Sequence, residues 1–184
     1  ADMVVGARIG SNVHSDPARA VAKWTFRQFA QWITGTRIPD LNSGLRVFRR
    51  RVAEQFMDLF PDGFSFTTTI TVASLIERLP VRFEPVDYMP RIGRSKVRPV
   101  PDTLRIARQL LWLGGRLAPL RTSLAVAVPL ASLGVVLSAY HLLRDNRLGA
   151  TDLIPVAAGL LALGVGFRAE RRRQRRRGAT AEGL

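Results

Sequence analysis

The residues best suited to chemistry in this chain are cations at the ends and on the faces of predicted elements. Arg8 ends an apolar run over residues 3–8 that predicts a buried strand, and open α/β sheets bind ligands at the carboxyl ends of their strands. Arg19 and Lys23 lie four residues apart, so they share one face of a helix predicted over residues 18–33. Arginine pairs with phosphate through two parallel hydrogen bonds. These cations predict a site for an anionic group, and the alternative for each is a solvated surface charge.

A predicted loop supplies the acidic candidate. Asp40 precedes Ser43 and Gly44, and Arg46 follows them. Asp40 is expected either to act on a substrate or to shape the turn, because Asp side chains favour bonds to nearby backbone in loops. Arg46 is expected to hold Asp40 or a phosphate.

A second predicted loop, over residues 90–101, is rich in proline and cations. Arg91, Ser95 and Lys96 lie on it, just before a basic amphipathic segment. A loop in this position can close over a bound ligand and exclude water. The alternative is that its cations contact lipid headgroups.

The elements that must position these residues alternate between helix and strand, which predicts an α/β portion over residues 1–100. Asp16 and Pro17 favour the start of the helix over residues 18–33, and Gly35 favours its end. The remaining predicted elements are a strand over residues 45–48, helices over residues 51–59 and 66–79, and a strand over residues 81–86.

The rest of the chain predicts attachment to a membrane. Residues 101–120 form a basic amphipathic segment, which favours a helix at the membrane surface over a plain packing helix. Residues 121–168 hold two predicted transmembrane helices. The first contains an uncharged run over residues 122–143, long enough to cross about 30 Å of hydrocarbon. The second, over residues 153–167, is apolar but shorter.

The arginine-rich tail over residues 169–184 sets the predicted topology. By the positive-inside rule it is cytoplasmic. Two crossings return the chain to its starting side, so the N-terminal portion is expected to be cytoplasmic too. The sequence thus predicts a multi-pass membrane protein. The alternative for the tail, nucleic-acid binding through Arg171 to Arg177, is less favoured beside a membrane helix.

Composition limits the possible partners and metal sites. The 28 cationic residues against 14 acidic ones give a net charge of +14, and only Lys23 and Lys96 are lysine. Such a surplus predicts an anionic partner: a lipid surface, phosphorylated substrates or nucleic acid. With no cysteine, and with His14 and His141 far apart, a thiolate or histidine metal site is not expected.

Four segments together resemble the family-2 type glycosyltransferases that act on polyprenyl phosphates, the group of dolichyl-phosphate mannose synthases and their bacterial relatives. Residues 1–8, Ala-Asp-Met-Val-Val-Gly-Ala-Arg, resemble the family's strand ending in Gly-Ser-Arg. Residues 40–49, Asp-Leu-Asn-Ser-Gly-Leu-Arg-Val-Phe-Arg, resemble its Asp-x-x-Ser-Gly-Phe-Arg pattern. Residues 64–66, Phe-Ser-Phe, precede a helix and a strand, and residues 91–96, Arg-Ile-Gly-Arg-Ser-Lys, resemble its Arg-x-Gly-x-Ser-Lys loop. The resemblance covers about residues 1–168.

The resemblance implies part of a GT-A-like nucleotide-sugar transferase domain, followed by the interfacial helix and the transmembrane hairpin. It assigns Arg8, Arg19 and Lys23 to the phosphate of the acceptor lipid, although Lys23 stands where the family has serine. Asp40 becomes the catalytic candidate, which would orient the acceptor or stabilise positive charge at the anomeric carbon. Arg46, Arg91, Ser95 and Lys96 become candidates for the donor side and its loop.

The resemblance also implies parts that this sequence does not contain. The family's Asp-x-Asp metal motif is absent from the 184 residues, so we expect the donor-binding half, with its Mg²⁺ or Mn²⁺, to lie upstream of Ala1. The chain alone is then expected to be inactive. The implied substrates are polyprenyl phosphate and a nucleotide sugar, and the sugar and the oligomeric state stay open. The main alternative is a non-catalytic, membrane-anchored protein that binds anionic lipid.

Overall fold

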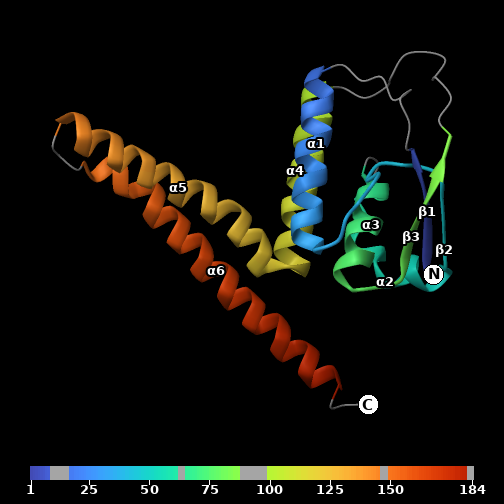
Figure 1. The fold of residues 1–184 in the computed structure, drawn as a ribbon. Helices are drawn as coiled ribbons and strands as arrows, with labels where there is room; N and C mark the ends of the chain where they lie inside the picture. Colours follow the sequence, from blue (N-terminus) through green and yellow to red (C-terminus); the bar gives the residue numbers. More distant parts are fainter. Residues whose placement is uncertain (9–16, 62–64, 88–98, 146–148, 182–184) are drawn as a thin grey trace. The chain divides into compact units, whose positions relative to one another are not determined.

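The computed structural model describes residues 1–8, 17–61, 65–87, 99–145 and 149–181. The chain forms two compact units, Ala1–Leu113 and Gly114–Leu184. The first unit is a small α/β structure, and the second is a pair of long helices (Figure 1). The predicted division into residues 1–100, 101–120, 121–168 and 169–184 stays a prediction.

The described part of the first unit contains one mixed, three-stranded sheet in the order β2-β1-β3. Strand β1 (Met3–Arg8) pairs antiparallel with β2 (Arg46–Phe48) and parallel with β3 (Val81–Val86). The register places Met3 opposite both Phe48 and Val81. The buried, central β1 confirms the apolar strand predicted at the start of the chain.

Helix α3 (Phe66–Ile76) forms the middle layer of the first unit. Every residue from Thr68 to Leu75 is buried, including three threonines and a serine. Figure 1 shows α3 between the sheet and α1 (Pro17–Thr34), which packs on it. A helix covered on both sides has no polar face, and its buried threonine hydroxyls have hydrogen-bond partners: Thr69 and Thr71 donate to the carbonyls of Ser65 and Thr67, and Thr68 donates to Asn42 Oδ1. This explains how a threonine-rich run forms a core helix.

The ends of the other elements follow local signals in part. Helix α1 begins at Pro17, and Gly35 adopts the left-handed conformation after its end, as predicted. The helix predicted over residues 51–59 is instead divided at Phe56 into α2 (Arg50–Gln55) and the 3₁₀ turn η1 (Met57–Leu59). The prediction of a loop over residues 90–101 is wrong for its last residues, because α4 (Pro99–Leu117) already begins at Pro99. Proline is favoured in the first helical turn, where its missing N–H costs nothing.

The second unit is an α-helical hairpin of α5 (Pro119–Asp145) and α6 (Ala150–Ala181). The two helices pack closely: a Cβ at Gly159 would lie 2.9 Å from the carbonyl oxygen of Ala127. Near the apex, His141 Nδ1 lies 2.7 Å from the buried carboxylate of Asp152, which also accepts the Gly149 N–H. The arginine-rich tail predicted after residue 168 continues α6 as helix to Ala181.

Both helices of the hairpin are long and apolar enough to cross a membrane. The candidate spans are Pro119–Arg144 and Thr151–Arg175, and only 17% of each apolar window is buried inside the protein. Large apolar side chains such as Leu143, Leu161 and Val165 are exposed. An exposed apolar surface of this kind fits association with a membrane.

Candidate functional site

The predicted site is organised around an ion pair between Arg8 and Asp40. Arg8 Nε lies 2.5 Å from Asp40 Oδ2, and Arg8 Nη2 donates to Asp40 Oδ1 at 2.9 Å. The backbone N–H of Arg8 also approaches Oδ2, at 3.3 Å. The structure therefore brings together two predicted site residues that lie 32 positions apart in sequence.

The pair is partly shielded from water, since 31% of the Arg8 side chain and 11% of the Asp40 side chain are exposed. Burial alone would raise the pKa of Asp40, but the hydrogen bonds and positive charge of Arg8 outweigh it and hold the pKa below the ordinary value of 3.8. Asp40 is thus a carboxylate at neutral pH, with its charge balanced by Arg8.

The loop that carries Asp40 is fixed at both ends. After α1, the Ile38 N–H donates to Gln31 Oε1 at 2.9 Å. Before β2, the Leu45 carbonyl accepts the Gly6 N–H at 2.9 Å. Glycine leaves room for this approach, because a Cβ at Gly6 would lie 2.8 Å from Leu45 Cδ2 and the Leu45 side chain would have to shift. The loop consequently crosses β1 close to Arg8.

Both roles considered for Asp40 find a basis in this geometry. The carboxylate accepts the N–H of Asn42 at 3.1 Å, a bond within the turn that is typical of Asp in loops. It simultaneously holds Arg8. Asp40 therefore shapes the loop and also places a negative charge at the end of β1.

Arg46 also holds the loop that carries Asp40, by binding it to helix α3. Its guanidinium donates to the Ser43 carbonyl, to the Thr67 carbonyl at 2.8 Å and to Thr71 Oγ1 at 2.9 Å. Burial lowers the pKa of Arg46 to about 10, with the negative charge of Asp40 opposing the shift, so it is charged at neutral pH. These bonds tie the loop to α3 and give Arg46 a positioning role. Its assignment to the donor side stays a prediction.

The other predicted cations are placed less completely. Lys23 is exposed on α1, on the same face as Ala30, which is buried two turns further along. Arg19 lies on the same helix, where the structure describes its backbone and not its side chain. Arg91, Ser95 and Lys96 lie outside the described residues, as does His14.

Sequence reasoning missed Arg27. Its Nη1 donates to the carbonyl of Pro39, at 3.5 Å, one residue before Asp40. The signal was present: Arg27 continues the four-residue spacing of Arg19 and Lys23 on α1. Extending that basic face by one turn would have found the contact between α1 and the loop.

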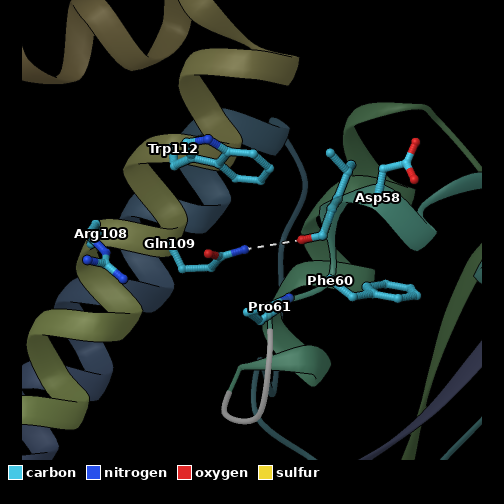
Figure 2. Close-up of a pocket in the computed structure, with 7 residues that line it drawn as sticks. Asp58, Phe60, Pro61, Arg108, Gln109 and Trp112 are labelled. Atoms are coloured by element: carbon cyan, nitrogen blue, oxygen red, sulfur yellow. Dashed lines mark hydrogen bonds between the residues drawn. The ribbon is translucent and has the colours of Figure 1, made fainter.

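An open hollow of about 430 Å³ lies elsewhere in the first unit, between residues 58–61 and α4. Figure 2 shows Gln109 of α4 reaching across it to the Leu59 carbonyl, at 3.3 Å. The same amide lies 3.3 Å from Thr69 Oγ1. Of the described residues, its lining includes none of the predicted site residues. We therefore centre the candidate site on Arg8 and Asp40.

The described carboxylates form no ligand group for the divalent metal that the resemblance implies. Among the described residues, no group of three acidic or histidine side chains is placed to hold a metal ion. Asp40 is paired with an arginine, and Asp152 with His141. The expected Mg²⁺ or Mn²⁺ of the complete enzyme stays a prediction, and so does the binding of an anion by Arg8.

Comparison with known proteins gives a similarity to a sugar transferase. The chain is similar to the low-salt glycan biosynthesis hexosyltransferase Agl6 of Haloferax volcanii, with 29% identity over 115 residues. The aligned part covers 60% of this chain and 28% of the relative, so the chain spans less than a third of that protein. No family model and no solved structure matches the chain. The similarity supports a relationship to glycosyltransferases and does not define a subtype.

Proposed function

We propose that this chain is the acceptor-binding, membrane-anchored part of a hexosyltransferase that moves a sugar from a nucleotide sugar to polyprenyl phosphate. The single observation that carries the proposal is the ion pair of Arg8 and Asp40 at the carboxyl end of β1. The similarity to a hexosyltransferase supports sugar transfer. The two apolar helices and the net charge of +14 support a lipid-bound, anionic acceptor.

The ion pair suggests how an acceptor phosphate enters. A phosphate offers Arg8 the same two-pronged geometry as the Asp40 carboxylate, so the two anions compete for one guanidinium. Exchange replaces one charge-assisted pair by another and releases the Asp40 carboxylate beside the bound phosphate. The loop stays in place during the exchange, because Arg46 and Asn42 hold it independently of Arg8.

The proposed reaction then requires little base catalysis. A phosphate monoester has its second pKa near 6, so its attacking oxygen is already largely ionised at neutral pH. That oxygen forms a bond to the anomeric carbon while the bond from this carbon to the nucleoside diphosphate breaks, and the diphosphate leaves with the electron pair. Arg8 positions the nucleophile, and the released Asp40 carboxylate stabilises positive charge at the anomeric carbon.

Binding of the acceptor can be tested on this chain directly. The chain is placed in lipid nanodiscs, and binding of polyprenyl phosphate is compared with binding of the same polyprenol without phosphate. We expect a preference for the phosphate that Arg8→Ala abolishes. Arg50→Ala is the matched control, since Arg50 is an exposed arginine that pairs with Glu54 on the surface of α2. Equal binding of both lipids, or an unchanged preference in Arg8→Ala, would contradict the proposal.

Transfer itself is tested in a protein in which a donor-binding segment precedes Ala1. Supplied with nucleotide sugars and polyprenyl phosphate, this protein is expected to form the glycosyl lipid, and the chain alone is not. Arg8→Ala is expected to lower kcat/KM for the acceptor. If the chain binds anionic lipids without any preference for polyprenyl phosphate, the non-catalytic lipid-binding alternative is the better description.

A further inference from the structure

Helix α1 has a second apolar face, on the side opposite the core. Its inner face contains the fully buried Ala30 and Ile33. On the other side, 64% of Val21, 54% of Trp24 and 53% of Trp32 are exposed. With 100° per residue, these three positions fall within an arc of about 80°, centred roughly opposite Ala30.

This outer stripe has no charge of either sign. Gln28 lies between Trp24 and Trp32 on the same arc, and helix α1 contains no acidic residue. Two half-exposed tryptophans on one helical stripe form an exposed apolar patch. Such patches mark sites of interaction with a protein or a membrane. Tryptophan is also the residue most typical of the boundary between a membrane and water.

The chain itself favours a bilayer as the occupant of this stripe. Helix α4 runs almost without interruption into the first candidate span: the Ala118 N–H donates to the Gly114 carbonyl at 2.7 Å, and α5 begins at Pro119. If α5 crosses a membrane, the first unit is tethered directly at its surface. Residues 1–113 hold 17 cationic and 10 acidic side chains, and their net charge of +7 attracts this unit to anionic headgroups and opposes pairing of two copies.

We propose that the stripe of Val21, Trp24, Gln28 and Trp32 is a membrane-contact surface that docks α1 into the headgroup region of an anionic bilayer. The inference rests on the membrane attachment included in the proposed function. It has a consequence for the site, since Arg27 of the same helix contacts the loop of Asp40. A helix is about 10 Å across, so docking by its outer face holds that loop within roughly one helix diameter of lipid phosphates.

The three tryptophans of the chain provide the test. Three full-length variants each keep a single tryptophan, Trp24, Trp32 or Trp112, with phenylalanine at the other two positions. Each is reconstituted into vesicles made of equal amounts of phosphatidylcholine and phosphatidylglycerol, with or without bromine on the acyl chains. Bromine quenches tryptophan emission only at short range. Circular dichroism verifies that each variant keeps its helices.

We expect brominated lipid to quench Trp24 and Trp32 relative to unbrominated lipid. The loss should be larger when bromine lies near the headgroup end, because interfacial helices sit only about 5–10 Å deep. In vesicles of phosphatidylcholine alone, and at high salt, quenching of both should fall. Undiminished quenching under these conditions would overturn the requirement for anionic lipid.

Trp112 separates this inference from the proposed function. It lies on α4, directly before the candidate spans, and is 43% exposed. Quenching of Trp112 without quenching of Trp24 and Trp32 overturns the docking of α1 and leaves membrane attachment intact. A protein that does not float with vesicles at all contradicts the membrane part of the proposed function. Protection of Trp24 that grows with protein concentration but not with lipid would identify a second copy as the occupant instead.

Discussion

The two units of this chain distribute polar and apolar side chains in opposite ways. In the first unit, apolar residues such as Val5, Ile33 and Ile70 are buried in a core. In the hairpin, large apolar residues such as Leu143 and Leu161 are exposed, while the carboxylate of Asp152 is 1% exposed. The exposed apolar surface of the hairpin fits association with a membrane.

The two units also differ in how they use buried charge. Around Asp40 the charged groups converge from three separate segments and hold a loop against α3. In the hairpin the buried pair of His141 and Asp152 joins two adjacent helices near their connection. The first arrangement fixes a loop beside the end of β1, where we propose the site, whereas the second joins α5 to α6. Four predictions test this comparison.

The largest expected effect comes from a charge on the outer face of the hairpin. Leu161 is exposed near the middle of the second candidate span. In lipid, Leu161→Arg should cost about 3 kcal/mol of insertion free energy. In water, an exposed substitution changes stability by about 0.5 kcal/mol or less. Vesicle flotation after reconstitution measures the difference.

The matched control places the same residue on the first unit. Val47 of β2 is 74% exposed, and Val47→Arg should leave both flotation and the unfolding of the first unit nearly unchanged. If Leu161→Arg is as harmless as Val47→Arg, the hairpin does not face lipid and the contrast between the two units disappears.

A smaller effect is expected from replacing Arg46, which ties the loop that carries Asp40 to α3. Arg46→Ala leaves the Ser43 and Thr67 carbonyls without this charged donor, so the first unit should lose about 2 kcal/mol of stability. Arg50→Ala, which removes only an exposed pair with Glu54, should cost less than about 0.5 kcal/mol. Urea unfolding in detergent, followed by circular dichroism, measures both. Equal costs would show that Arg46 does not hold the loop.

The sequence predicted the elements of the first unit because their signals are local. The buried run of β1, the Pro17 and Gly35 ends of α1 and the alternation in β3 each depend on a few neighbouring residues. The break at Phe56 could not be predicted, because the 3₁₀ turn after it depends on how Leu59 is buried in the unit. The start of α4 at Pro99 was missed because a proline-rich stretch also fits a loop.

The site could be predicted as a set of residues, but not as a set of contacts. Arg8, Asp40 and Arg46 were recognised from their types and positions. Their pairing was not: Arg46 was expected to hold Asp40 or a phosphate, yet it binds the Ser43 carbonyl and α3. The choice depends on Thr71, which enters the site only after α3 packs on the sheet. Side-chain pairing between distant segments is a property of the tertiary fold.

A third prediction concerns the close packing that makes the hairpin a scaffold. Gly159→Leu pushes a side chain into the Ala127 carbonyl of α5, only 2.9 Å from the new Cβ, and overpacking should cost about 1–2 kcal/mol. Gly164→Leu on the same helix meets no atom within 4 Å of its Cβ and should be nearly neutral. Thermal unfolding of the full chain in detergent compares the two. Equal melting temperatures would mean that α5 and α6 do not pack at Gly159.

The smallest effect is the dependence of the first unit on pH through Asp40. Because the pKa of Asp40 is lower in the folded state than the ordinary 3.8, its ionisation stabilises the fold above that value, and the contribution is lost as the pH falls through the folded pKa. Asp40→Asn should flatten this part of the curve. Arg8→Ala should weaken it, because the pKa of Asp40 rises once the side-chain bonds and charge of Arg8 are lost, while the backbone N–H groups of residues 8 and 42 still lower it. Side-chain carboxyl NMR shifts report the pKa, and melting temperatures between about pH 3 and 7 report the stability. An acid dependence that is the same in all three proteins would show that the ion pair at the proposed site does not form in solution.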